Sequence, residues 1–345
     1  MRVAIIGGSG YGAVELARLL EQHPSVELSQ IISHSQAGVA FSEIYPQMVT
    51  IIDQAMVDFN LEKLLNDIDL VCLATPSDVS HKLVPKILEL KIKCIDLSGD
   101  FRLNHAELYQ DWYGFKTSAG EYLHQAVYGL SEIYQDQIAN AQLVANPGCF
   151  PTAILLALIP IIKTGIIALH SMIIDGKTGV SGAGRGLSLN VHFSEMNENL
   201  KAYQLGKHKH IPEIEQILSE KSNDSVKVSF TPHIVPMTRG IMTTIYTDLK
   251  HDVTQEEVEE LYEQFYQEHP FIRIRKKGQV PSTKEVYGSN YCDIGFHVDK
   301  RMKKLIIVSV IDNLVKGAAG QAVQNLNLIA GWEQETGLKN IPIYP

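Results

Sequence analysis

The fold is decided by residues 2–16, which read RVAIIGGSGYGAVEL. Residues 2–7 form an apolar run typical of a parallel strand that is buried on both faces, and residues 14–20 have helical periodicity. The glycines between them follow the spacing Gly7-x-x-Gly10-x-x-Ala13, which lets the backbone approach a pyrophosphate at the start of a helix. The stretch therefore predicts a strand–loop–helix unit that binds a dinucleotide; an ordinary glycine-rich turn is the alternative.

The second predicted strand, residues 26–32, is followed by Ser33-His34-Ser35 and not by an acid. An Asp or Glu at this strand end would bond the ribose 2′-hydroxyl of NAD. Its absence leaves room for a 2′-phosphate, which small hydroxyls and a histidine can accept. The sequence therefore favours NADP(H) as the cofactor, with an ordinary polar loop as the alternative.

Further buried strands are expected at residues 69–75, 92–97 and 142–145, each separated from the next by a helical pattern. This alternation predicts a doubly wound parallel sheet, and ligands bind at the carboxyl ends of such strands. The residues expected at that edge are Gly10, Ser33, Pro76, Ser98 and Cys149.

The pattern changes beyond about residue 163, where strand-like runs predict an α+β domain with a mixed or antiparallel sheet. The fold class is thus α/β: a Rossmann-type doubly wound parallel sheet plus an α+β catalytic and dimerisation domain with a mixed sheet. We expect a dinucleotide-binding domain over residues 1–148, completed by a C-terminal helix over 313–345, and a catalytic domain over 149–312. The runs lie at 166–175, 226–235, 240–249, 271–276, 291–298 and 304–312, with helices near 211–221 and 254–268.

Composition narrows the class of partner. The chain has 345 residues and a formal net charge of -9, so it has no basic excess with which to neutralise nucleic-acid phosphates. Its four cysteines are scattered without metal-ligand spacing, which predicts no metal site and fits a reducing cytoplasm. No signal-peptide pattern precedes the first strand, and the apolar residues 150–169 are interrupted by Pro160, Lys163 and Gly165, so no membrane span is expected.

The stretch NPGCFPT, residues 146–152, places Cys149 where an apolar strand gives way to an apolar helix. Pro147 and Gly148 supply the turn, and Pro151 suits the first turn of a helix. A thiol at this point faces unpaired backbone amides and the positive end of the helix dipole, which favour the nucleophilic thiolate. Cys149 is therefore a candidate nucleophile; a buried structural cysteine is the alternative.

A basic cluster, residues 206–216, puts two histidines and two lysines just before a predicted helix start at Pro212. It can hold an acidic substrate and supply a proton acceptor, although a solvated charge run has the same composition. His208 lies between two lysines, which lower its pKa and keep it neutral and ready to accept the Cys149 proton. His210 is nearer the helix start, where it caps the first turn or pairs with Glu213. Spacing alone does not choose between the two histidines.

Two further segments carry candidate anion-binding groups. Residues 176–186 form a second glycine-rich stretch, whose backbone amides, with Ser181 and Arg185, suit an anion; a flexible surface loop is the alternative. Residues 96–103 put Arg102 at the predicted ligand edge as a phosphate or carboxylate clamp, unless it simply pairs with Asp100.

With these motifs the chain resembles the N-acetyl-gamma-glutamyl-phosphate reductase family and is more distantly similar to aspartate-semialdehyde dehydrogenases. The resemblance covers essentially the whole chain, but three positions depart from the family pattern: Ala13, Ser131 and residues 75–78. None of them touches the cysteine or the histidines. The motifs that carry the resemblance are residues 7–16, 96–103, 128–132, 146–152, 181–185, 208–216 and 312–325.

The resemblance implies NADPH-dependent reduction of N-acetyl-glutamyl 5-phosphate to the 5-semialdehyde, with release of phosphate, in arginine biosynthesis. It implies that Cys149 forms a thioester, that His208 is the acid/base, and that Asn313 holds the nicotinamide carboxamide. A homodimer or homotetramer is expected. The cofactor candidates are Gly7, Ser9, Gly10, Tyr11, Gly12, Ser33, Ser35, Pro76, Ser181, Gly182 and Asn313; the substrate candidates are Arg102, Asn146, Arg185 and His210.

Three other functions remain open at this point. An aspartate-semialdehyde dehydrogenase would use the same chemistry on another acyl phosphate, although the 206–216 cluster speaks against it. A Cys–His hydrolase would need no nucleotide. An NADP-sensing regulator would leave Cys149 with ordinary thiol reactivity.

Overall fold

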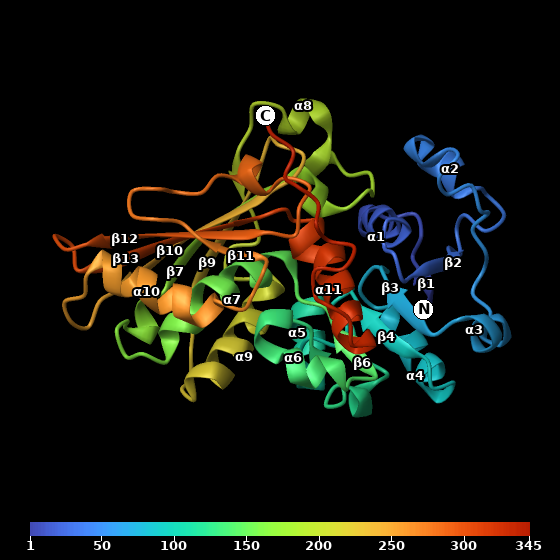
Figure 1. Ribbon diagram of the computed structural model, residues 1–345, viewed down its shortest axis with the longest axis horizontal. Coiled ribbons are helices and arrows are strands. Elements are labelled where there is room, and N and C mark those ends of the chain that lie inside the picture. The colour runs from blue at the N-terminus through green and yellow to red at the C-terminus, as the bar shows by residue number, and fades with distance from the viewer. The chain divides into compact units, whose positions relative to one another are not determined.

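The computed structural model describes the backbone of residues 1–345 and every side chain except those of residues 65 and 66. The chain divides into two compact units, which are described separately (Figure 1). Unit 1 comprises Met1–Pro147 and Ala318–Lys339, and unit 2 comprises Gly148–Gly317 and Asn340–Pro345.

Unit 1 is built on a six-stranded sheet with the order β2-β1-β3-β4-β6-β5, and every neighbouring pair is parallel. The strand order reverses between β1 and β3, and this switch point is where ligands bind in sheets of this kind. The strands are β1 (Arg2–Ile6), β2 (Glu27–Ile32), β3 (Leu70–Leu73), β4 (Lys93–Asp96), β5 (Val127–Tyr128) and β6 (Leu143–Ala145).

Helices cover both faces of this sheet, which confirms the predicted doubly wound arrangement. Ala4 and Ile6 of β1 share a core with Leu64 of α3 and Val84 of α4 on one face. Helix α1 packs against α11, and α11 against α6 and β4. The helices are α1 (Tyr11–Glu21), α2 (Phe41–Ile44), α3 (Leu61–Asp67), α4 (Ser80–Glu89), α5 (Ala106–Tyr113), α6 (Ser131–Ala139) and α11 (Gly320–Ala330), with 3-10 turns η1 (Pro46–Met48) and η2 (Gly120–Tyr122).

Unit 2 is built on a seven-stranded mixed sheet, as the sequence predicts, with the order β11-β12-β13-β10-β7-β9-β8. The pairs β11/β12 and β7/β9 are parallel, and the other pairs are antiparallel. The strands are β7 (Ile173–Gly179), β8 (Lys201–Ala202), β9 (Ser229–Val235), β10 (Ile241–Asp248), β11 (Ile272–Ile274), β12 (Cys292–Asp299) and β13 (Lys304–Ile311).

Helix α7 (Cys149–Ile162) is the most completely buried helix of unit 2 among the described residues. All of its residues after Cys149 are buried, because it packs against β10 and β13 and against helices α9 and α10 (Figure 1). No helix of the described residues is both long enough and apolar enough to cross a membrane. The other elements are α8 (Phe193–Met196), α9 (His210–Ser222), α10 (Gln255–Tyr266), the π-helix η7 (Val315–Ala319) and the 3-10 turns η3 (Leu169–Ser171), η4 (Val180–Ala183), η5 (Leu189–Val191) and η6 (Thr283–Val286).

Two predicted boundaries are wrong. The strand expected over 166–175 is β7, which begins at Ile173 and continues to Gly179. Its glycines belong to the sheet because there is no room for side chains: a Cβ on Gly176 would lie 2.6 Å from Phe150 Cε1, and one on Gly179 would lie 2.7 Å from the Thr238 carbonyl oxygen. The glycines that predict a loop are therefore needed for close packing within a strand.

The helix expected over 313–345 covers only residues 315–330, as η7 followed by α11. Gly331 ends α11 in the left-handed conformation, with φ of 71°, which glycine adopts at little cost. The last residues of the chain, 332–345, form no helix.

Candidate active site

The first glycine-rich loop is shaped by close backbone packing in unit 1. Gly7 has φ of +97°, and a Cβ there would lie 2.5 Å from the Ala74 carbonyl oxygen at the end of β3. A Cβ on Gly8 would lie 2.5 Å from Ile31 Cγ2 of β2. These two positions exclude any side chain, so the loop stays close to the ends of β1, β2 and β3.

The same loop leaves space at the start of α1. Gly10 is the N-cap without a side-chain cap, and a Cβ on Gly12 would meet nothing within 4 Å. The first-turn amides of a helix have no partner within the helix and bind phosphate oxygens well. Ser9, whose carbonyl accepts the Tyr45 hydroxyl at 2.9 Å, and Tyr11 flank this space and are half-buried. The loop and helix start therefore fit a dinucleotide pyrophosphate.

The loop after β2 differs from its predicted role in two ways. Ser33 is buried and its backbone N–H donates to Val57 at 3.0 Å, so of the residues expected to meet a 2′-phosphate only His34 and Ser35 are exposed. Val57 forms a parallel bridge with Ile32, which brings the Asp58 carboxylate 3.3 Å from His34 Nδ1. An acid does therefore reach this edge. Asp58 cannot be predicted at this edge from the residues after β2, because it belongs to a later segment of the chain.

Asp100 caps a helix of unit 1. Its carboxylate accepts the backbone N–H groups of Asp78 and Val79, both at 3.1 Å, and of His81 at 3.3 Å, at the start of α4. Pro76, in the loop between β3 and α4, is exposed. Burial and the Asp100 charge raise the pKa of the neighbouring Asp96 to about 6.

Arg102 bonds to backbone carbonyls at the carboxyl ends of β4 and β6, and Asn146 bonds to Ala318 and Asn325. The Arg102 Nε donates to the Asn146 carbonyl at 2.7 Å and Nη2 donates to the Leu97 carbonyl at 2.9 Å. The Asn146 amide is completely buried; it donates to the Ala318 carbonyl at 3.1 Å and accepts from Asn325 at 3.0 Å. The Asn146 side chain is thus bonded within unit 1, and Arg102 links the ends of β4 and β6; the substrate contacts expected of both residues stay predictions.

Cys149 occupies the expected turn in unit 2. It is the first residue of α7, directly after the N-cap Gly148, and it is half-buried. The other three cysteines are buried, and burial raises the pKa of Cys72 to about 12. A Cβ on Gly317 of η7 would lie 2.9 Å from Cys149 Cβ, so the π-helix backbone packs directly against the candidate nucleophile.

The start of α9 packs against the residue before Cys149. A Cβ on Gly148 would lie 2.5 Å from His210 Nε2, so the imidazole lies against this glycine. The Gly148 N–H donates to Glu213 Oε1 at 2.8 Å, and Glu213 is completely buried. This hydrogen bond joins the first turn of α9 to the start of α7, and the expected cap or pairing of His210 with Glu213 stays a prediction.

His208 lies in an aromatic enclosure in unit 2. Its ring centroid is 5.4 Å from that of Phe230, 5.5 Å from Tyr203 and 5.9 Å from Phe150. Burial, and secondly the charge of Lys209, lower its pKa to about 4. The neutral state that the neighbouring lysines predict therefore has burial as its main cause.

The hydrogen bonds of His208 define its tautomer. The backbone N–H of His210 donates to His208 Nδ1 at 3.1 Å, which occupies the lone pair on that nitrogen. The proton of the neutral ring is then on Nε2, which lies 3.5 Å from the Tyr203 hydroxyl. His208 thus presents a donor, and not the acceptor that the sequence analysis expects, on its Nε2 side.

The second glycine-rich segment also differs from expectation. The backbone N–H groups of Gly179, Val180 and Ser181 donate to carbonyls in residues 237–240, so these amides are not available to an anion. Asn313 accepts the Gly240 N–H at 2.7 Å and donates to Ser181 Oγ at 2.9 Å. Ser181, Gly182 and Asn313 therefore form one cluster, in which Asn313 has one amide hydrogen left for a carboxamide.

Two arginines are associated with the second glycine-rich segment: Arg185 belongs to it in the sequence, and Arg239 lies next to it in the structure. Arg185 is exposed. Arg239 follows Thr238 in the turn that bonds Ser181, and its guanidinium is 3.7 Å from the completely buried Asp312 carboxylate. Arg239 is not among the predicted residues, because a single arginine between two strands gives no signal of its own.

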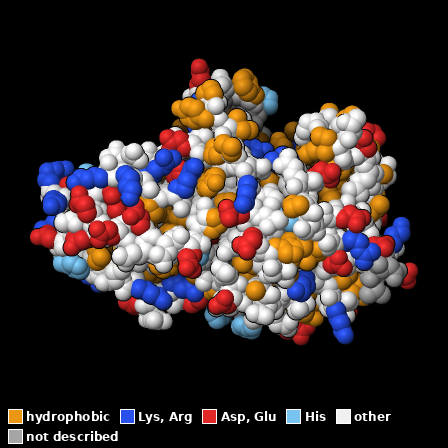
Figure 2. All heavy atoms as spheres, in the orientation of Figure 1, with side chains coloured by type: hydrophobic (Ala, Val, Ile, Leu, Met, Phe, Trp, Pro, Cys, Tyr) orange, Lys and Arg blue, Asp and Glu red, His pale blue; other side chains and the backbone are white. Residues whose placement is uncertain are grey.

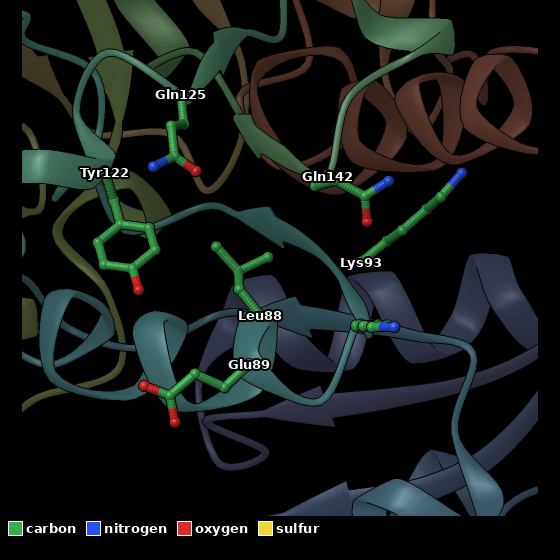
Figure 3. A pocket seen from close by; sticks show the side chains of 7 residues that line it. Leu88, Glu89, Lys93, Tyr122, Gln125 and Gln142 are labelled. Atoms are coloured by element: carbon green, nitrogen blue, oxygen red, sulfur yellow. The ribbon is translucent and has the colours of Figure 1, made fainter.

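A hollow on unit 1 does not coincide with any predicted site. It lies at the amino ends of the strands, beside the start of β4 and the end of α4, opposite the edge where ligands bind (Figure 3). Among the described side chains, no three His, Cys, Asp or Glu residues are placed to hold a metal ion. The hollow is lined by Leu88, Glu89, Lys91, Lys93, Tyr122, Gln125 and Gln142.

Comparison with known proteins agrees with this architecture. The semialdehyde dehydrogenase NAD-binding domain model matches residues 2–141, and the semialdehyde dehydrogenase dimerisation domain model matches residues 149–313. Aspartate semialdehyde dehydrogenase II from Vibrio cholerae has the same fold, with a TM-score of 0.72 over 96% of this chain and 98% of that one, at 19% identity. The enzyme from Candida albicans, solved with NADP, has a TM-score of 0.70 over 95% and 98% of the chains at 15% identity. The class is thus that of the two-domain semialdehyde dehydrogenases.

Sequence relatives narrow this class. An N-acetyl-gamma-glutamyl-phosphate reductase from Staphylococcus saprophyticus is 53% identical, and one from Oceanobacillus iheyensis is 51% identical. The alignments cover all of this chain and 100% and 99% of those proteins, respectively. The chain belongs to the N-acetyl-gamma-glutamyl-phosphate reductase family, which confirms the resemblance inferred from its motifs.

Proposed function

We propose that the chain catalyses NADPH-dependent reduction of N-acetyl-L-glutamyl 5-phosphate to N-acetyl-L-glutamate 5-semialdehyde and phosphate, a step of arginine biosynthesis, in the cytoplasm. The observation that carries the proposal is the half-buried Cys149 at the first position of α7, in a family whose members bear this activity in their names. The other three cysteines are buried and cannot take this role.

The chemistry starts from the Cys149 thiolate. The sulfur attacks the acyl carbon, the C–S bond forms, and the bond to phosphate breaks with its electron pair, which leaves a thioester and inorganic phosphate. The nicotinamide, when bound, supplies a hydride to the thioester carbon. The resulting oxyanion collapses to the aldehyde and expels the thiolate, so the cycle returns Cys149 to its starting form.

This sequence of steps needs a hydrogen-bond donor more than a base. Negative charge develops on the acyl oxygen in both halves of the reaction, and the thiolate is regenerated without a proton acceptor. A neutral His208 with its proton on Nε2 suits that task, since it can donate to the oxyanion near pH 7. We therefore assign His208 as the hydrogen-bond donor to the oxyanion, and His210 as the group that fixes the turn at Gly148.

For the cofactor, we propose that the loop from Gly7 to Gly12 holds the pyrophosphate, with Ser9 and Tyr11 beside it. His34 and Ser35 are the exposed groups suited to the 2′-phosphate of NADP(H), and Pro76 contributes to the same edge of unit 1. Ser181, Gly182 and Asn313 form the cluster proposed for the nicotinamide end.

For the substrate, we propose Arg185 and Arg102 as anion-binding groups. Arg185 is exposed on a segment that follows β7, and guanidinium groups match phosphate and carboxylate geometry well. The net charge of -9 makes such local positive groups necessary for binding a substrate that is itself an anion.

The deciding experiment is phosphate-dependent NADP reduction with N-acetyl-glutamate semialdehyde, run beside aspartate semialdehyde. We expect turnover with the acetylated substrate, and turnover at least about tenfold slower with the other. Faster turnover of aspartate semialdehyde would establish the alternative activity. Cys149→Ser should abolish turnover and leave NADP binding intact, because the thioester cannot form.

We further propose that a second copy of the chain covers part of unit 2, as a homodimer or a dimer of dimers. The matched dimerisation domain model spans residues 149–313, and within them several large apolar side chains are exposed around α8, where Figure 2 shows hydrophobic surface. Analytical ultracentrifugation tests the proposal, and a purely monomeric species would refute it. The exposed side chains are Leu187, Leu189, Phe193, Leu200 and Leu205.

A further inference from the structure

Asp312 is a completely buried acid of unit 2 to which the proposed chemistry gives no role. It follows the last residue of β13 directly. Its Oδ1 accepts the backbone N–H groups of Leu314 at 2.8 Å and Val315 at 3.2 Å, and its Oδ2 accepts that of Gly288 at 2.8 Å. Burial of a carboxylate is costly unless donors of this kind surround it. Backbone groups of two separate segments therefore hold this side chain in one place.

The first two of these bonds span Asn313. Because Asp312 bonds to the two residues that follow Asn313, the peptide groups on both sides of Asn313 are fixed. The Asn313 side chain accepts the Gly240 N–H at 2.7 Å and donates to Ser181 Oγ at 2.9 Å. Asp312 thus fixes the backbone that carries the amide proposed for the nicotinamide end of the cofactor.

The backbone of Asp312 fixes a second point of unit 2. Its carbonyl accepts the Gly317 N–H at 2.9 Å, and this bond joins residues five apart, as in a π-helix. Gly317 lies against the candidate nucleophile, since a Cβ there would lie 2.9 Å from Cys149 Cβ and 3.3 Å from Cys149 Cα. The same acid therefore bonds to the turn that carries Gly317 and to the residues around Asn313.

The third bond of the carboxylate anchors this arrangement to the segment after η6. Gly288 belongs to that segment, and Thr283 of η6 packs against the turn before β10: a Cβ on Gly240 would lie 2.9 Å from Thr283 Cβ. Gly240 is also the residue whose N–H bonds Asn313. The contacts thus form a closed ring through three segments that are distant in the sequence, with Asp312 as its charged member.

We propose that Asp312 is a positioning residue for the reduction. It holds the Asn313 amide and the Gly317 backbone in fixed places, so that the nicotinamide and the Cys149 sulfur are aligned for hydride transfer to the thioester. Asp312 acts through these two neighbours and exchanges no proton with the substrate. The inference rests on the proposed function, which supplies the roles of Cys149 and Asn313.

Two variants test this role in the turnover of N-acetyl-glutamate semialdehyde with NADP and phosphate. Asp312→Ala removes both oxygens, and we expect kcat to fall by about 10²-fold, the effect of a misplacement of about 1 Å. Asp312→Asn keeps one oxygen for the N–H groups of Leu314 and Val315, so kcat should fall by only about tenfold, the effect of one lost hydrogen bond to a charged group. The KM for the semialdehyde should change little in both variants, because the groups proposed to bind it are unchanged.

Hydrogen exchange of the backbone amides of residues 314–317, followed by peptide mass spectrometry, reports the same contacts without substrate or cofactor. We expect faster exchange in both variants, and the larger change in Asp312→Ala. Asp293→Asn is the matched control: Asp293 is another completely buried acid of unit 2, but it bonds to Arg273 and Arg275. The control should lower the melting temperature and leave both kcat and exchange at 314–317 unchanged.

Each outcome supports or overturns the role of Asp312. A folded Asp312→Ala protein with wild-type kcat would overturn it, and so would a fall in kcat without faster exchange at residues 314–317. An equal fall in kcat in Asp293→Asn would assign the effect to a general loss of stability. If Asp312→Ala does not fold, Asp312→Asn decides by the same two measurements. A wild type that does not turn over the acetylated semialdehyde would refute the proposed function, and this inference with it.

Discussion

Replacing Gly148 by alanine tests how the histidines are held near Cys149. Gly148 has φ of -66° and ψ of 154°, which alanine adopts without strain, so the backbone itself should tolerate the change. The added methyl, however, would lie 2.5 Å from Nε2, 2.8 Å from Cδ2 and 2.9 Å from Cε1 of His210. The effect of Gly148→Ala is therefore a steric effect on one imidazole ring.

The size of the effect follows from these distances. Non-bonded heavy atoms are comfortable at about 3.5–4.0 Å, so the ring must retreat by about 1 Å. It cannot retreat freely, because its centroid is 4.7 Å from that of His208 and 6.3 Å from that of Phe150. We expect a stability loss of about 1–3 kcal/mol, the usual range for an overpacked core. We also expect a fall in kcat of about 10²-fold, since a misplacement of about 1 Å transmitted to the reacting groups can have this effect.

Steady-state kinetics and thermal melts of Gly148→Ala measure both effects. Gly186→Ala is the control, since a Cβ on that exposed glycine would meet nothing within 4 Å. The control should keep the wild-type kcat and melting temperature. A Gly148→Ala enzyme with wild-type kcat and an unchanged melting temperature would show that the His210 ring does not fix this turn.

Three other variants test separate features. Asp58→Asn should lower the KM for NADPH several-fold and leave that for NADH unchanged, because it removes a carboxylate beside His34; equal effects on both cofactors would refute a 2′-phosphate site there. Gly317→Ala should lower the free energy of unfolding by about 1 kcal/mol and kcat by at least tenfold, because its Cβ would lie 2.9 Å from Cys149 Cβ. A higher free energy of unfolding in urea would mean that the helix propensity of alanine outweighs this contact. Between pH 4 and 6.5, His208 is expected to bind a proton only in the unfolded chain, so its contribution lowers the melting temperature as the pH falls through this range. Asp96 contributes in the opposite direction, so the melting temperatures of the wild type and of His208→Asn, which share that contribution, are compared at each pH. Parallel curves of melting temperature against pH for the two proteins would refute the buried neutral imidazole.

Most of the fold could be predicted from apolar runs and glycine spacing. Strands β1 and β3 are buried on both faces apart from Arg2, so the sequence shows them as apolar runs, and the helix after Gly10 follows from its periodicity. Cys149 was predicted at the start of α7 because the prolines and glycine around it force a turn. These features depend on residues that are close together in the sequence, so they can be predicted without knowledge of the tertiary contacts.

The errors concern groups whose partners are distant in sequence. Gly176 reads as a loop residue, yet it lies in β7 because Phe150 and Phe230 fill the space of its side chain. Asn146 lies close to Cys149 in the sequence, while its amide bonds Ala318 and Asn325 of a segment far along the chain. No window of sequence contains both members of such pairs.

The tautomer of His208 also depends on contacts that the sequence does not show, and it has the largest consequence for the proposed mechanism. A sequence shows a histidine between lysines, and charge alone predicts a neutral base. Only the fold places the His210 N–H against Nδ1 and the Tyr203 hydroxyl near Nε2, which converts the expected acceptor into a donor. An acyl-transfer cycle that begins and ends with a thiolate consumes no base, whereas its oxyanions need donors at fixed positions. The close contacts at Gly148 and Gly317 hold the start of α7 and the neighbouring His210 ring, and in the proposed mechanism this rigidity keeps reorganisation during the reaction small.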